Sequence, residues 1–167
     1  AYSQAAFYLG LTYSALFDHD KAEQFYKKAI EIDPDYLDAR ANYGGMLLDR
    51  GNVDESIRQF NTVLQRDPKH VNALTLVSQA YRIKELYSQS IESARAAILL
   101  APKSAEPHMW LAESLRLSGK YEESRGEYEA YLRLSDFDSK MAGKLNYYVL
   151  GFLAGIGHKK RAGTRDI

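Results

Sequence analysis

The sequence contains no cysteine among its 167 residues. That absence excludes disulfide bonds, thiolate metal sites and a cysteine nucleophile. It does not select a cellular compartment, although the cytoplasm is slightly favoured. An excess of either charge is also missing, because 22 basic residues balance 22 acidic ones. Proteins that bind nucleic acid by neutralising phosphates normally carry a clear basic excess, so we expect no nucleic-acid partner.

Long apolar runs are missing as well. The longest candidate is 145–157, which is apolar apart from Asn146 and is flanked by Lys144 and by the basic residues 158–161. A membrane-spanning helix needs about 20 apolar residues, so we expect no membrane span. Contact of 145–157 with a membrane interface stays open as an alternative. The sequence begins at Ala1 without an initiator methionine or a signal-peptide pattern, which predicts a mature or trimmed fragment.

Patterns of catalytic or metal-binding residues are not found either. The four histidines are His19, His70, His108 and His158, and no two of them have the four-residue spacing of a zinc-binding helix. The sequence has neither a Gly-x-Ser-x-Gly turn nor a Rossmann-type glycine pattern. Acidic pairs such as Asp18/Asp20 fall in turns or helix starts, where carboxylates cap helices. We therefore expect no enzyme, no cofactor and no bound metal.

The sequence does contain a repeat with a period of 34 residues. Pro34, Pro68 and Pro102 mark this period, and other columns follow them without a gap. Small residues form two columns, which are Gly10, Gly44, Ser78 and Ala112 and then Ala22, Ser56, Ser90 and Ser124. Large apolar residues form a third column at Tyr26, Phe60 and Tyr128. The alignment predicts four units at 3–36, 37–70, 71–104 and 105–138.

Each column has a physical reason within a pair of helices. Apolar residues between the turns recur at three- and four-residue spacing, which is the helical period. Small residues are expected where two helices of one hairpin approach closely, and large apolar residues where a hairpin meets the next one. Proline ends the second helix, because it lacks a backbone donor and disfavours helix in the residue before it.

This pattern resembles the tetratricopeptide repeat family, whose 34-residue unit is a helix-turn-helix hairpin. The resemblance covers residues 3–138 and implies an all-α fold, a right-handed superhelical solenoid of four such units. Two features depart from the family pattern. The position usually held by tryptophan is occupied by Ala6, Arg40, Leu74 and His108. Asp136 stands where the proline of the fourth unit is expected.

The segment after the fourth unit is predicted to close the stack. Apolar residues recur at helical spacing over 139–154, and the last unit of a solenoid needs a cover for its apolar face, so we expect a capping helix there. Residues 155–167 are expected to form a flexible basic tail. A phosphate-binding loop is disfavoured, since Gly163 is followed directly by Thr164 without the required lysine.

The resemblance also implies where a partner binds, because the concave face of the superhelix is lined by the first helices. Carried onto this sequence, the predicted partner-binding groove consists of Phe7, Leu11, Ala41, Asn42, Gly45, Leu48, Asn72, Thr75, Gln79, Arg82, Met109, Glu113 and Arg116. Its N-terminal half is apolar or small, and its C-terminal half carries both charges. The alternative is that these residues are solvated and pair among themselves, as Arg82–Glu113 or Glu113–Arg116.

One known binding mode of the family does not fit this sequence. Tetratricopeptide proteins that dock chaperone C-termini use a clamp of lysine, asparagine and arginine on three successive first helices. Only Asn42 matches that clamp here, while Phe7 and Leu11 hold the first two positions and Asn72 and Leu76 the last two. A carboxylate clamp is therefore not expected.

The sequence predicts a protein–protein interaction scaffold that holds a peptide or helix of a partner in its concave groove. The alternative is a structural or regulatory repeat segment of a larger protein, which packs against a neighbouring domain or associates with another copy of itself.

Overall fold

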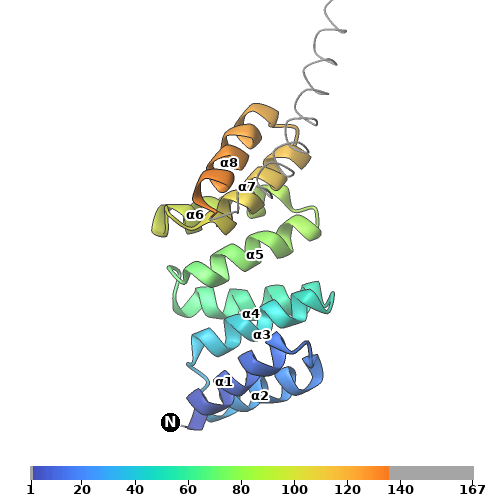
Figure 1. The fold of residues 1–167 in the computed structure, drawn as a ribbon, viewed down its shortest axis with the longest axis vertical. Coiled ribbons are helices and arrows are strands. Elements are labelled where there is room, and N and C mark those ends of the chain that lie inside the picture. Colours follow the sequence, from blue (N-terminus) through green and yellow to red (C-terminus); the bar gives the residue numbers. More distant parts are fainter. Residues whose placement is uncertain (1, 136–167) are drawn as a thin grey trace, which may run out of the picture.

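The structure, a computed structural model, describes residues 2–135, which form eight α-helices and no strand. The helices are α1 (Tyr2–Ala15), α2 (His19–Ile32), α3 (Leu37–Asp49), α4 (Val53–Arg66), α5 (Val71–Ile83), α6 (Tyr87–Leu100), α7 (Ala105–Leu117) and α8 (Tyr121–Leu134). They are stacked one after another along the long axis of the molecule (Figure 1). The predicted all-α helical repeat fold is confirmed.

Some sequence-based expectations are not settled by these helices. The predicted capping helix 139–154, the tail 155–167 and the possible interfacial segment 145–157 lie outside the described residues. The unit boundaries stay a prediction, because helix bounds alone do not fix where one repeat ends and the next begins. Among the helices that are described, none combines the length and apolar character that crossing a bilayer requires.

The stack of helices curves, with the odd-numbered helices on its inner side. Each odd helix contacts the even helix that follows it, and each of α2, α4 and α6 also contacts the next odd helix. The odd helices touch one another along the stack, α1 with α3, α3 with α5 and α5 with α7. Within residues 2–135 no two even helices make such contacts. Because successive odd helices lie closer together than successive even ones, the shared face of the odd helices is the concave face.

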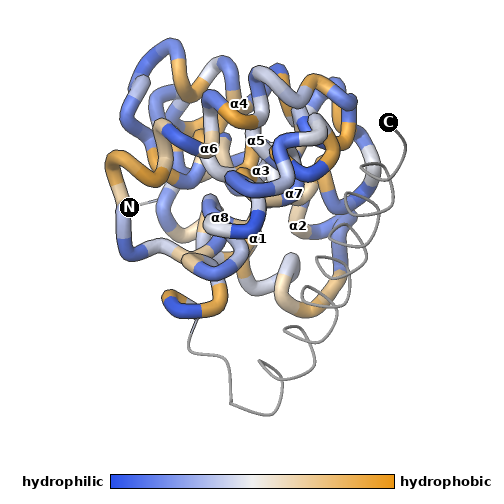
Figure 2. The backbone as a smooth tube through the Cα atoms, turned by 90° about the horizontal axis from the view of Figure 1, so that it is seen from above, coloured by the Kyte–Doolittle hydropathy of each residue, from blue (hydrophilic) through white to orange (hydrophobic). Residues whose placement is uncertain are grey.

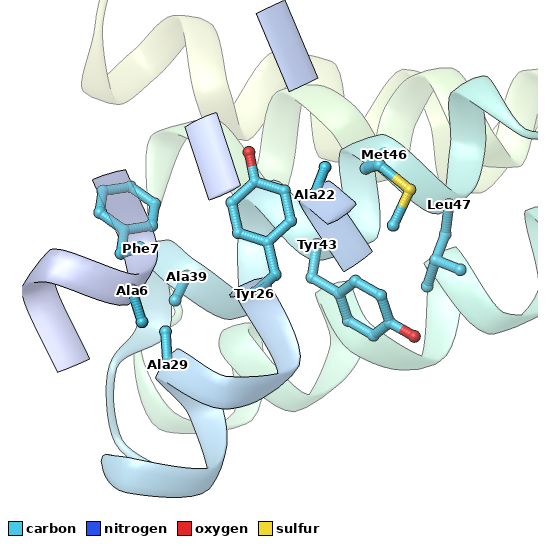
Figure 3. Close-up of a cluster of buried hydrophobic side chains, with 9 residues drawn as sticks. All are labelled: Ala6, Phe7, Ala22, Tyr26, Ala29, Ala39, Tyr43, Met46 and Leu47. Atoms are coloured by element: carbon cyan, nitrogen blue, oxygen red, sulfur yellow. The ribbon is translucent and has the colours of Figure 1, made fainter. Parts of the chain in front are cut away.

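Apolar and polar residues alternate along the helices, as the view down the stack shows (Figure 2). The buried side chains form clusters between neighbouring hairpins. One cluster joins Tyr26 and Ala29 of α2 to Ala39, Tyr43 and Met46 of α3 (Figure 3). A second joins α4 to α5 and a third joins α6 to α7. The core is therefore a chain of contacts between neighbours, as expected for a solenoid.

The two helices of a hairpin approach closely at the first column of small residues. A Cβ atom added to Gly10 would lie 2.6 Å from Cδ1 of Tyr26, and one added to Gly44 would lie 2.7 Å from Cε1 of Phe60. Tyr26 and Phe60 are only 1% and 0% exposed, so their rings are enclosed by protein atoms and cannot turn out into solvent without disrupting the packing. The small residues are thus required by the close approach of two helices.

In the later hairpins the second small column adds hydrogen bonds to this close approach. The hydroxyl of Ser90 donates to the backbone carbonyl of Ser78 at 2.7 Å, and that of Ser124 donates to the carbonyl of Ala112 at 2.8 Å. Both serines are buried. A buried hydroxyl needs such a partner, and here the facing helix supplies it.

All four turns inside the hairpins place one residue in the left-handed region of the backbone. These residues are Phe17, Gly51, Glu85 and Gly119, with φ between 58° and 82°. The amide of the next residue bonds back to the odd helix, as from Leu86 to the carbonyl of Tyr81 at 2.9 Å. This is the geometry of a glycine-type helix C-terminus. Phe17 and Glu85 adopt it at a steric cost that Gly51 avoids.

Replacing Glu85 by glycine is expected to stabilise the protein. Glu85→Gly should raise the free energy of unfolding by about 1 kcal/mol, because glycine adopts positive φ without a clash of its Cβ. Urea denaturation followed by circular dichroism measures this. The control is Glu92→Gly in the middle of α6, which should lower stability by about 1 kcal/mol. A loss of stability with Glu85→Gly would contradict the assigned turn.

Adding one methyl group at the close approach is expected to destabilise the protein. Gly44→Ala should lower the free energy of unfolding by about 1–3 kcal/mol, since the added Cβ overlaps the enclosed ring of Phe60. The matched control is Gly126→Ala in α8, where an added Cβ meets nothing within 4 Å. That variant should be neutral or up to about 1 kcal/mol more stable. Equal effects of the two substitutions in denaturation curves would argue against the close approach.

Candidate partner-binding groove

All thirteen predicted groove residues lie on odd-numbered helices, whose shared face is concave. Four of them are nevertheless buried. These are Phe7, Ala41, Leu48 and Thr75. The ring of Phe7 lies against that of Tyr36, with 5.0 Å between centroids, and Ala41 and Leu48 belong to the core that contains Phe60. The surface of the groove is therefore narrower than the sequence predicts.

The burial of these four residues has a common cause. A residue's position within its helix identifies the side of the helix on which it lies but not the neighbours of that side. Because successive odd helices touch, part of the concave side faces the next odd helix instead of solvent. These four side chains can support the floor of a groove, but they offer no surface to a partner in this conformation.

The other nine predicted residues reach the surface. Asn72 is exposed, and the partly exposed ones are Leu11, Asn42, Gly45, Gln79, Arg82, Met109, Glu113 and Arg116. Asn42 is held against its own helix, because its Nδ2 donates to the carbonyl of Asp38 at 2.8 Å. We use the term concave stripe for these nine residues from here on.

A polar cluster forms where α7 meets α8. A guanidinium nitrogen of Arg116 donates to Oε2 of Glu113 at 2.7 Å, and the hydroxyl of Tyr128 donates to Oε1 of the same carboxylate. The Glu113–Arg116 pair is one of the two pairings that the sequence leaves open. The sequence places Tyr128 only in a packing column. Its second function, as a hydrogen-bond donor to Glu113, arises because α7 and α8 pack face to face.

The electrostatics of this cluster favour an ionised carboxylate. Burial opposes ionisation of Glu113, but hydrogen bonds from Arg116 and Tyr128, together with the charges of Arg116 and Arg82, outweigh that effect and lower its pKa. The hydrogen bond to Glu113 is the main reason why the pKa of Arg116 is raised. Burial, followed by the hydrogen bond to Glu113, raises the pKa of Tyr128. At neutral pH the cluster is a fixed ion pair with a neutral phenol.

Arg82 has different surroundings from Arg116. Its guanidinium carbon lies 5.4 Å from the centroid of the Trp110 ring, a cation–π contact. The indole Nε1 of Trp110 in turn donates to Glu106 at 3.4 Å. Within residues 2–135 no carboxylate forms an ion pair with Arg82, and its Nε is buried without a hydrogen-bond partner. The ring therefore orients a cation whose donors are not all used.

Sequence reasoning missed Trp110 as a member of this site. It is the one tryptophan of the chain and lies directly after the predicted residue Met109. Its contact with Arg82 joins α5 to α7, and the sequence contains no signal for that pairing beyond the 34-residue period.

The described part of the chain offers no metal centre, since no three histidine, aspartate or glutamate side chains gather there in a way that could hold an ion. His108 and His70 are each used in pairs. Nδ1 of His108 lies 2.6 Å from Oε2 of Glu127, and Nε2 of His70 lies 3.1 Å from Oδ1 of Asp38. Both pairs join neighbouring helices or hairpins, which is a structural role.

Comparison with protein families gives two matches. Family models described as Tetratricopeptide repeat match residues 14–80 and residues 84–139. Together they cover most of the region in which the 34-residue period is found.

Curated relatives are much longer proteins. Protein O-mannosyl-transferase Tmtc3 of Drosophila melanogaster is 31% identical over 75 residues, which are 45% of this chain and 8% of that protein. Tetratricopeptide repeat protein 37 of Xenopus laevis is 24% identical over an alignment that covers 80% of this chain and 11% of that protein. The chain thus spans about a tenth of the length of these relatives, and the transferase name belongs to the Drosophila protein.

Solved structures share the fold at low sequence identity. A thermophilic TPR protein of Thermus thermophilus matches with a TM-score of 0.77 and 21% identity, over 89% of this chain and 83% of that one. MamA of Desulfovibrio magneticus matches with a TM-score of 0.69 and 19% identity, over 79% of this chain and 75% of that one. At this level of identity the likeness concerns the fold alone.

The lowered pKa of Glu113 predicts how stability depends on pH. A carboxyl whose pKa is lowered by folding stabilises the protein above the ordinary pKa of glutamate, and this contribution is lost as the pH falls through the lowered value. Glu113→Gln should therefore cost about 1–2 kcal/mol of unfolding free energy at pH 7, and less towards pH 3.

Urea denaturation at several pH values measures this difference. Glu92, which is exposed on α6, provides the control. Glu92→Gln should change stability by less than about 0.5 kcal/mol at every pH. A deficit of Glu113→Gln that stays constant from pH 7 to pH 3 would show that the ionised carboxylate is not the source of the stabilisation.

Proposed function

The chain belongs to the tetratricopeptide repeat family, whose members serve as protein–protein interaction scaffolds, and from this premise we propose that it binds an extended peptide or a helix of a partner along the concave stripe. The family is generally non-catalytic. We keep the expectation that these residues carry out no reaction of their own, and the similarity to a transferase covers too little of that protein to suggest otherwise.

The proposal is carried by the surroundings of Arg82. This arginine is partly buried, its guanidinium lies over the Trp110 ring, and none of the described carboxylates forms an ion pair with it. A desolvated cation gains from a charged or carbonyl acceptor, and arginine presents its donors in a fixed plane that suits such groups. A backbone carbonyl or a carboxylate of a partner would supply the acceptor.

The neighbouring residues suit the remainder of a peptide. Gln79 and Asn72 lie on the same helix as Arg82, one and three turns before it, and their amides can both donate to and accept from a peptide backbone. Leu11 and Gly45, on α1 and α3, provide the apolar and small end of the stripe. The stripe therefore combines polar groups for a backbone with apolar surface for a side chain.

The fixed pair of Glu113 and Arg116 supports a selective groove. The Glu113 carboxylate accepts hydrogen bonds from Arg116 and Tyr128. The charge of Arg82 helps to lower the pKa of Glu113, but the two side chains form no direct ion pair. The groove thus holds the guanidinium of Arg82 in a fixed orientation, while Glu113 and Arg116 are paired with each other. We infer a preference for partners that present an acceptor opposite Arg82, in a mode that does not use the chaperone-type clamp.

The proposal is tested by affinity capture from the native source with two matched variants. The groove variant carries Asn72→Ala, Gln79→Ala and Arg82→Gln. The control variant carries Gln24→Ala, Gln65→Ala and Lys28→Gln, which change the same kinds of side chain at exposed positions of α2 and α4. Circular dichroism checks that all three proteins are equally helical.

The expected result is a protein that the wild type and the control variant capture equally and that the groove variant captures at least about tenfold less. Loss of a few central contacts commonly has an effect of that size. Titration of the purified partner against each variant then gives the dissociation constants. If the groove variant captures as much partner as the wild type, the concave stripe is not the binding site.

A further inference from the structure

Helix α1 differs from the other helices in having no charged residue and no histidine between Tyr2 and Ala15. It also exposes large apolar side chains, with Tyr2 84%, Tyr8 56% and Leu9 43% exposed. A single exposed leucine carries little information, since much of any protein surface is apolar. The repeat, however, allows each exposed residue of α1 to be compared with its counterparts in the other three units.

The comparison shows that α1 exposes the columns that the other units bury. Leu9 corresponds to Tyr43, Val77 and Leu111, which are 7%, 0% and 2% exposed. The same holds on either side of Leu9 along the helix. Exposed Ala5 corresponds to buried Ala39, Ala73 and Pro107, and exposed Thr12 corresponds to buried Met46, Ala80 and Ser114. Leu9, Ala5 and Thr12 are called the outer face of α1 below.

In the other three units, these columns are covered by the second helix of the preceding hairpin. The hydroxyl of Tyr43 donates to Glu23 of α2 at 3.3 Å, and Ser114 lies in hydrogen-bonding contact with Ser90 of α6 at 2.6 Å. Val77 shares a buried cluster with Phe60 and Val63 of α4. Figure 3 shows Tyr43 and Met46 of α3 beside Tyr26 of α2, in the buried cluster that joins these two helices. The outer face of α1 therefore has the composition of a contact between hairpins.

We propose that the outer face of α1 docks the second helix of a further tetratricopeptide-type hairpin, joined ahead of α1 as neighbouring hairpins are joined here. Continuity with the three contacts α2–α3, α4–α5 and α6–α7 identifies the occupant. The side-chain sizes on α1 also match those on α5. Ala5, Leu9 and Thr12 repeat the small-large-small order of Ala73, Val77 and Ala80.

Other occupants fit the chemistry less well. Helices that lie on membrane surfaces carry lysine or arginine on their polar face, and nucleic acid requires cations for its phosphates. The residues of α1 include neither cation. A face without charge favours an apolar helix as its partner. The outer face is also distinct from a terminal cap, whose outer side is polar in repeat proteins.

The test extends the full chain by one hairpin in register. A copy of residues 37–70 replaces Ala1 and Tyr2 and is joined directly to Ser3, because Val71 follows that hairpin in the natural sequence and aligns with Leu37 and Ser3. Amide hydrogen exchange then measures protection of α1 in the extended and the original chain. Two variants of the extended chain complete the set, Leu9→Lys on the outer face and Gln4→Lys beside it.

Gln4 is the matched control because its column is exposed in every unit, at Asp38, Asn72 and Glu106. The expected result is that extension raises the protection of α1 at least about tenfold. Leu9→Lys should abolish this gain in protection, and Gln4→Lys should preserve it. No gain in protection, or an equal loss with both lysines, would overturn the proposal.

Sedimentation of the original chain addresses the rival occupants. A monomer at all concentrations agrees with the proposal. Self-association that Leu9→Lys abolishes and Gln4→Lys preserves would show that a second copy covers the outer face, and binding to anionic vesicles lost with Leu9→Lys would assign the face to lipid. Either result overturns the proposal. Neither depends on the concave stripe, so the failure of this inference and that of the proposed function are distinguishable.

Discussion

The contact between the second helix of one hairpin and the first helix of the next is the interaction on which the whole structure depends. Tyr26 and Phe60 pack against the glycines of their own hairpins, but one hairpin cannot bury its whole apolar side, and the clusters that contain Tyr26, Phe60 and Ile91 are completed by the first helix of the next hairpin. Within residues 2–135 each helix contacts only helices one or two places away along the chain. Stability then accumulates from neighbour to neighbour, and the outermost helices have the least support.

The same stacking determines what the concave face can display. Since the odd helices touch one another, each of their side chains facing inward must either fill the space between helices or reach the surface. Phe7 and Ala41 do the first, whereas Gln79 and Arg82 do the second. Curvature is obtained by bringing these helices together, and it is obtained at the expense of binding surface. A groove of this kind has few free side chains, which makes each of them a stronger determinant of specificity.

The fold could be predicted from the sequence because its main constraints are local and repeat. Gly10 and Gly44 are small for a reason that recurs in every hairpin, and the prolines at the helix ends act within a few residues. The candidate site was less predictable. Burial of Leu48 and Thr75 depends on how far successive odd helices approach, and the Arg82–Trp110 contact depends on their rotation. The turn residue Glu85 also escaped notice, because its left-handed backbone is imposed by the hairpin and not by its own preference.

The placement of Trp110 has an experimental consequence. Because the chain contains one tryptophan, and that indole lies beneath Arg82 on the concave side, its ultraviolet emission arises from a single known environment. Any molecule that displaces the guanidinium or covers the ring alters the polarity around that indole. The wavelength and intensity of the emitted light then follow occupancy of this part of the molecule directly. The protein thus carries its own spectroscopic label, with no dye to attach and no second chromophore of the same kind to subtract.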